Sequence, residues 1–225
     1  MMKNRRRSSF KRLFLLAVAL CSLLLSGNTV QAALVTYSFT GNVGNVAPVL
    51  SGTFNNTQSM SGSITVNMLD NNLGNNRLGN YTVTNFNLNI GGYNATMGSA
   101  AGEVVIRDRV PPAAALDTVS VNVNADGPMV NFLGLRLFDV DLRGPSNTFS
   151  GDALPMTPPS ISSFTNFNRF RLVFGPVGMQ RVVSGTLANI AAVPLPAAVI
   201  LFGAGLVALV GLGAGGLRNL RKFQA

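Results

Sequence analysis

Apolar and polar residues alternate along much of the chain between residues 33 and 190. Apolar side chains occupy every second position at residues 35–39, 64–68, 119–123 and 170–174. This period of two is typical of strands that bury one face and expose the other. Clusters of Gly and Asn at residues 41–45, 70–80, 91–92 and 175–178 predict turns. We therefore expect an all-β, antiparallel β-sandwich or jelly-roll-like domain of about seven to nine short strands.

The alternation changes phase once. Tyr81 and Val83 occupy odd positions, whereas Phe86, Leu88 and Ile90 occupy even ones. A β-bulge near residues 84–85, or a bend of the strand there, explains such a change.

Three further segments have distinct patterns. Residues 133–140 are apolar on both faces and predict a central strand. The proline-rich residues 111–112 and 154–160 predict loops, and residues 189–193 a short linker to a membrane segment. Nothing before Ala197 sustains a helical period.

The N-terminus has the layout of a secretory signal peptide. A basic start precedes an apolar stretch at residues 13–25, and Val30-Gln31-Ala32 supplies small residues for a signal peptidase cut after Ala32. An uncleaved anchor is the alternative, but 13 residues at about 1.5 Å each fall short of the ~30 Å hydrocarbon layer. We expect cleavage after export by the Sec route.

The C-terminus predicts one transmembrane helix. Residues 197–217 carry no charge, and as a helix they span about 31 Å, one bilayer thickness. Arg218, Arg221 and Lys222 follow, and the positive-inside tendency places them in the cytoplasm as a basic anchor, with residues 33–193 outside. Gly211 and Gly215 form a G-x-x-x-G pair, which suits either helix dimerisation or ordinary contact with lipid.

A short motif precedes this helix. It consists of Val193, Pro194, Leu195, Pro196 and Ala197, and the sequence Leu-Phe-Gly-Ala-Gly-Leu follows at residues 201–206. Together with the basic tail, the segment resembles a PEP-CTERM sorting signal in its VPLPA variant, over roughly the last 33 residues. Leu195 stands where the defining Glu of the family occurs.

The resemblance implies an exosortase as a membrane partner that recognises residues 193–197 and processes the chain. The motif also has a physical property that suits processing, independent of the resemblance. Two prolines separated by one residue disfavour a helix and leave carbonyl groups unpaired, which suits a processing enzyme. The alternative is that the prolines only start the helix.

The charge distribution argues against nucleic acid. The net charge of +9 arises at the termini, because residues 33–217 contain equal numbers of basic and acidic residues. Without a basic cluster, contact with phosphates lacks its main driving force. The chain has no His and a single Cys, Cys21, within the signal peptide. Ordinary hydrolase triads, zinc sites and disulfides are thereby excluded, and we expect no cofactor, no metal and no catalytic residues.

Two groups of acidic and amide residues are candidate sites. Asp139 and Asp141 share a strand face at about 7 Å between α-carbons, which overlaps the spacing of inverting glycosidases. Arg136 and Arg143 flank the two aspartates, so a solvated ion-pair face is the preferred interpretation. The other group offers oxygen ligands for calcium but reads equally as a turn; it comprises Asp70, Asn71, Asn72, Asn75 and Asn76.

Carbohydrate is a further candidate ligand, since Asn and Thr side chains can bind sugar hydroxyls. Against it, the chain has no Trp and three Tyr, so few rings could stack on a sugar.

The sequence predicts three parts: a signal peptide (1–32), a β-sandwich ectodomain (33–190) and a sorting segment (191–225). We expect an exported, non-enzymatic protein of the cell envelope or extracellular matrix. Its partners would be signal peptidase, an exosortase, the membrane and, as a further candidate, extracellular polysaccharide. The alternatives are a permanently anchored single-pass protein with a carbohydrate-binding ectodomain, and a secreted glycoside hydrolase.

Overall fold

The computed structural model describes residues 34–72, 77–108 and 116–193. These residues form an all-β, antiparallel fold, as the alternation predicted. The strands are β1 (Leu34–Val46), β2 (Ser59–Asp70), β3 (Leu78–Ile90), β4 (Tyr93–Met97), β5 (Gly102–Arg107), β6 (Asp117–Asp126), β7 (Leu135–Gly144), β8 (Phe167–Phe174) and β9 (Arg181–Val193). Two short 3-10 turns, η1 (Pro48–Leu50) and η2 (Ile161–Ser163), lie in the connections.

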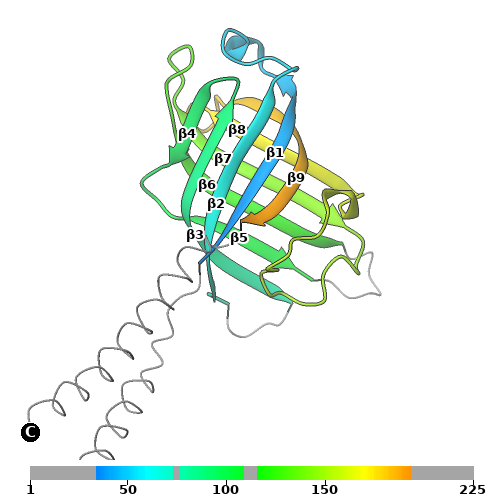
Figure 1. The fold of residues 1–225 in the computed structure, drawn as a ribbon. Coiled ribbons are helices and arrows are strands. Elements are labelled where there is room, and N and C mark those ends of the chain that lie inside the picture. Colours follow the sequence, from blue (N-terminus) through cyan, green and yellow to red (C-terminus); the bar gives the residue numbers. More distant parts are fainter. Residues whose placement is uncertain (1–33, 73–76, 109–115, 194–225) are drawn as a thin grey trace, which may run out of the picture. The chain divides into compact units, whose positions relative to one another are not determined.

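The strands form one closed sheet and not the two separate sheets of a sandwich. Around the ring the order is β2-β1-β9-β8-β7-β6-β5-β3, and a pairing of β3 with β2 closes it. The short β4 lies between β3 and β6 beyond the start of β5. Figure 1 shows the strands wrapping around a common interior. The sandwich expectation was wrong because a barrel and a sandwich share the same alternation and differ only in whether the outer strands meet.

Bulges bend the long strands enough to close the ring. β1 pairs with β9 through register shifts at Thr40/Gly41 and Val43/Asn45. Between β2 and β3 the register steps from Thr65↔Asn85 to Val66↔Val83, which leaves Thr84 as the extra residue. The bulge predicted from the change of phase is thereby confirmed. Bulges increase strand twist and bending, which a small closed sheet requires.

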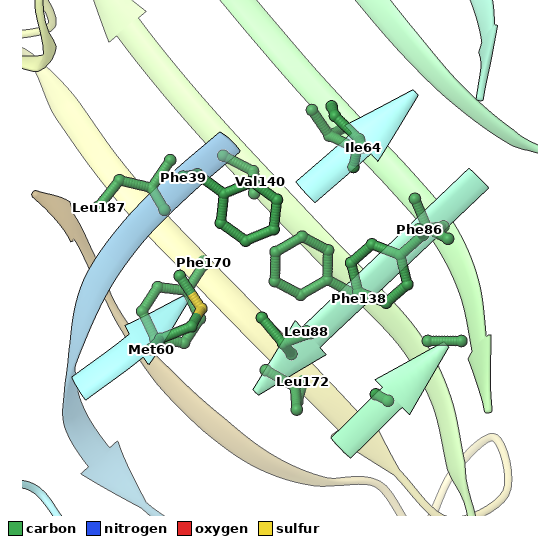
Figure 2. Close-up of a cluster of buried hydrophobic side chains, with 14 of the residues drawn as sticks. Phe39, Met60, Ile64, Phe86, Leu88, Phe138, Val140, Phe170, Leu172 and Leu187 are labelled. Atoms are coloured by element: carbon green, nitrogen blue, oxygen red, sulfur yellow. The ribbon is translucent and has the colours of Figure 1, made fainter. Parts of the chain in front are cut away.

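Aromatic side chains fill the interior. The ring of Phe138 stacks against Phe86 at 5.0 Å and Phe39 at 5.7 Å between centroids, and Phe170 lies 6.5 Å away. Figure 2 shows Phe138 at the centre of this cluster, with Phe39, Phe86 and Phe170 around it. All four rings are buried, so the interior is a packed core, as in other barrels of this size.

Successive strands run in opposite directions, except β4 and β5, which both run antiparallel to β3. The other connections therefore alternate between two ends. We call one end the base; it carries Leu34, Val193 and the β7–β8 connection (residues 145–166). The opposite end, which we call the tip, carries the β6–β7 connection (residues 127–134) and the β8–β9 connection (residues 175–180).

Two local expectations were wrong. Residues 41–45, expected to form a turn, lie within β1. Residues 189–193, expected to form a linker, continue β9 and pair with β1. The glycine turns at residues 91–92 and 175–178 are confirmed, with positive φ at Gly91, Gly92, Gly175 and Gly178.

Candidate functional site

The base brings together the two ends of the folded domain. Leu34 begins β1, two residues after the expected signal peptidase site, and Val193, the first residue of the expected sorting motif, ends β9. Thr36 pairs with Val193, and Tyr37 pairs with Ala192. We call this pairing of β1 with the end of β9 the seam. The backbone of Val193 is held in the sheet, whereas its side chain is exposed.

The remaining predicted site residues lie outside the described part of the chain: Ala32, Pro194, Leu195, Pro196, Ala197, Arg218, Arg221 and Lys222. The helix predicted for residues 197–217 lies there as well. Within the described ranges, no helix has the length and apolar character needed to cross a bilayer.

The 145–166 connection covers the base, and tyrosines from the barrel fasten it. The hydroxyl of Tyr37 donates to the carbonyl oxygen of Pro155 at 2.6 Å. The Tyr81 hydroxyl donates to the carbonyl oxygen of Asp152 at 2.9 Å and accepts from the backbone N–H of Leu154 at 3.2 Å. Burial raises the pKa of both tyrosines above the usual value, so these hydroxyls stay protonated and keep donating.

An apolar cavity of about 50 Å³ lies beneath this covering connection. Its walls include Tyr37 and Ile64 of the barrel, and Leu154, Pro155 and Phe164 of the connection. Sites for small organic ligands usually measure about 300–1,000 Å³. The cavity is too small for such a ligand and is best described as a packing void.

A polar groove of about 360 Å³ lies on the outer surface where β5 begins. Its polar lining residues are Asn71, Asn80, Thr82, Glu103, Asn122 and Asn124. Asn80 Nδ2 lies 3.4 Å from Glu103 Oε2, and Asn71 Nδ2 donates to Thr82 Oγ1 at 2.9 Å. Amide, hydroxyl and carboxylate groups together can both donate to and accept from the hydroxyls of a sugar.

The sequence did not single out this groove. Asn122 and Asn124 are the polar members of an alternating segment, and Glu103 is opposite Asn122 only through the β5–β6 register. An outward Asn is also an ordinary surface residue. The grouping of these polar residues can therefore be recognised only once the pairing of the strands is known.

Asp139 and Asp141 lie on the outer face of β7, as predicted, and each forms an ion pair. Arg171 Nε lies 2.9 Å from Asp139 Oδ1, and Arg143 Nε lies 3.0 Å from Asp141 Oδ1. The hydrogen bonds to these carboxylates raise the pKa of Arg171 and Arg143. Arg143 was expected to flank the pair, but the partner of Asp139 is Arg171 and not Arg136. Both carboxylates are thus paired with arginines, and neither is a free acid for glycoside cleavage.

The described members of the calcium candidate form hydrogen bonds with nearby parts of the chain. Asp70 Oδ1 accepts from the backbone N–H of Asn72 at 2.9 Å and of Asn80 at 2.8 Å. Asn72 Nδ2 donates to the carbonyl oxygen of Leu78 at 2.7 Å. Asn75 and Asn76 lie outside the described residues. Within the described ranges, no group of three or more Asp, Glu, His or Cys is placed to hold a metal ion.

Comparison with known proteins adds no relative. No family model, curated protein or solved structure matches the chain. The function is therefore inferred from the residues and the geometry of this molecule.

Proposed function

We propose that the protein is an exported, non-enzymatic component of the cell envelope or extracellular matrix. In this proposal the Sec route exports it, signal peptidase cuts after Ala32, and an exosortase recognises residues 193–197. The C-terminal helix holds the chain in the membrane, with its basic anchor in the cytoplasm, until processing is complete.

One observation carries the proposal: a complete barrel lies between the two expected processing positions. The ring of strand pairs begins at Leu34 and ends at Val193, and its buried aromatic core comes from the same residues. Every strand of the ring has both of its neighbours within residues 34–193. Residues 34–193 thus have the hydrogen bonds and the core needed to fold alone, as released cargo must.

The seam also supports the proposed position of the sorting motif. Val193 is the last residue of β9, and its backbone is paired with Thr36. Pro194 has no backbone N–H and cannot extend the ladder. Val193, the first residue of the proposed motif, is thus the last described residue of this ladder, and an exosortase would bind the prolines that follow it in the sequence.

The sorting step is tested by replacing both motif prolines. Pro194→Ala together with Pro196→Ala should retain the chain at full length in the inner membrane, as deletion of the exosortase should. The matched control is Pro176→Ala, an exposed proline in a connection at the tip, which should leave sorting unchanged. Fractionation gives the location, and intact-mass analysis gives the ends. A wild-type protein that keeps every residue through Ala225 in cells with the enzyme would contradict processing.

A second candidate function is binding of extracellular polysaccharide by a permanently anchored protein. The polar groove with Asn122, Asn124 and Glu103 favours it, because its volume falls in the range of ligand sites. Binding of isolated polysaccharide by residues 33–193, with residues retained through Ala225 in cells, would support this candidate. A secreted glycoside hydrolase would instead show an activity that is lost in Asp139→Asn, and we expect no such activity.

A further inference from the structure

Two neighbouring connections at the tip expose large apolar side chains. Met129 and Phe132 belong to the β6–β7 connection, and Val177 and Met179 to the β8–β9 connection; their exposures range from 65 % to 93 %. The backbone N–H of Gly175 donates to the carbonyl oxygen of Gly134 at 2.9 Å, which holds the two connections side by side. We call these four residues the apolar tip.

Phe132 occupies a conformation that is unfavourable for a bulky residue. Asn131 and Phe132 have φ of 50° and 66°, both in the left-handed region. They form a two-residue turn, in which the N–H groups of Val130 and Leu133 donate to each other's carbonyl oxygens at 3.0 Å and 2.9 Å. Asn tolerates this conformation, but the Cβ of Phe makes it costly.

The turn is held firmly while its aromatic ring points to solvent. The Tyr93 hydroxyl donates to the carbonyl oxygen of Pro128 at 3.1 Å, and Asn131 Nδ2 donates to that of Val49 at 3.3 Å. Val130 is buried, whereas Phe132 is 93 % exposed and adds almost nothing to the core. The fold therefore accepts strain to present a ring that does not stabilise it, a combination that indicates a binding role.

Two cations lie beside this surface. Arg136 follows Leu135 at the start of β7, and Arg181 begins β9 opposite Phe174; both are exposed. Asp126 lies at the foot of the β6–β7 connection, where its Oδ1 accepts from the backbone N–H of Gly127 at 2.8 Å. Apolar side chains flanked by arginines suit a lipid surface with anionic headgroups.

We propose that the apolar tip inserts into the interfacial layer of a phospholipid bilayer, with Arg136 and Arg181 at the headgroups. A second copy of the chain fits less well, because a stable protein interface takes about 800 Å² and some 20–30 residues from each partner. Four side chains on two convex connections provide far less. Lipid requires no complementary surface, so each inserted side chain contributes separately.

The test uses Phe132→Asn in residues 33–193, the part whose ring of strands and core are complete without the termini. Asn is compatible with the left-handed turn, so the variant should melt at or above the wild-type Tm. Its binding to phosphatidylglycerol-containing vesicles, measured by flotation, should fall by about 10-fold or more. Leu69→Asn, which removes an exposed leucine from β2, is the matched control and should bind as wild type does.

A second variant reports the position of the ring directly. The chain has no Trp, so Phe132→Trp provides a single tryptophan, which can be excited apart from the tyrosines. With anionic vesicles its emission should shift to the blue and be quenched by lipids brominated on their acyl chains. Arg136→Gln with Arg181→Gln should weaken binding to anionic vesicles and leave that to phosphatidylcholine vesicles unchanged.

Three results would overturn the proposal. The first is a wild-type domain that floats with neither kind of vesicle. The second is a Phe132→Asn variant that binds vesicles as tightly as the wild type. The third is a concentration-dependent dimer that Phe132→Asn abolishes in the absence of lipid, which would assign the apolar tip to a second copy of the chain.

Discussion

At the scale of single residues, two aspartates on one strand differ in their dependence on a partner. The side chain of Asp139 is 7 % exposed and pairs with Arg171 on β8. That of Asp141 is 18 % exposed and pairs with Arg143 on its own strand. A carboxylate removed from water needs its counter-charge more than a hydrated one does. The two arginines should therefore contribute unequally to stability.

We expect Arg171→Met to lower the free energy of unfolding by about 2 kcal/mol, because it leaves Asp139 without its main donor. Arg143→Met should change it by no more than about 0.5 kcal/mol, as for a surface pair. Urea unfolding of both variants at neutral pH provides the measurement. Equal losses of unfolding free energy in the two variants would show that the burial of Asp139 does not determine how much its arginine contributes to stability.

The sequence could predict the face of these aspartates but not the partner of Asp139. Alternation places Asp139 and Asp141 outward, and Arg143 follows two residues later on the same face. Arg171 reaches Asp139 through the β7–β8 register, which no local pattern contains. Arg136 lies at a register shift between Leu135 and Leu137, and this shift removes it from the expected row.

At the scale of elements, the period of the apolar residues predicts the strands well, whereas a glycine within a strand is easily mistaken for a turn. The strands and the bulge at Thr84 followed from the period of the apolar residues. Gly41 and Gly44 predict a turn at residues 41–45, which instead lie within β1. In the structure a Cβ at Gly41 would lie 2.9 Å from the Met60 side chain, so this glycine allows close strand packing within β1.

A pair of glycines at the β1–β9 bulge tests this account. A Cβ on Gly185 would meet the carbonyl oxygen of Asn42 and lie 2.7 Å from the Phe170 ring. Gly185→Ala should therefore cost about 2 kcal/mol through overpacking. For Gly44→Ala, the nearest atom to the new Cβ is the α-carbon of Gly185 at 3.9 Å, so the change should be near neutral. Thermal unfolding compares the two, and a similar loss in both would contradict the role of close packing.

At the scale of the whole molecule, each of the three tyrosines of the chain ties a connection to the barrel. Tyr37 and Tyr81 hold the 145–166 connection at the base, and Tyr93 holds the 127–134 connection at the tip. Each ring belongs to the core, and each hydroxyl donates to a backbone carbonyl oxygen. Burial raises the pKa of Tyr93 to about 12 and that of the other two above the usual value.

These shifts predict a loss of stability in alkali. A pKa raised in the folded state favours the neutral phenol, so its contribution is complete below about pH 10, the unfolded value. It declines as pH rises toward 12. Absorbance at 295 nm should show no ionised tyrosine in the folded protein at pH 10, and ionisation should then coincide with loss of circular dichroism. Ionisation near pH 10 with an unchanged spectrum would contradict the assignment; titration in concentrated urea is the control.

Closure of the barrel could not be predicted from the sequence. The period of the apolar residues shows that each strand has one buried face, but not which strands meet. Ser38 Oγ donates to the carbonyl oxygen of Ala191 at 3.4 Å, across 153 positions of sequence. No local pattern encodes such a contact. It belongs to the β1–β9 pairing, one of the links from which the ring is built.

The seam also sets the time at which the molecule can fold. β1 is among the first parts of the domain to be synthesised and β9 is the last, so β1 cannot form its pairing with β9 until synthesis of the domain is complete. At translation rates of about 5–20 residues per second the delay is roughly 10–30 s. Pairings so distant in sequence also form slowly. The ring thus cannot close until the final strand has been made, so the chain remains unfolded long enough for the export that we propose.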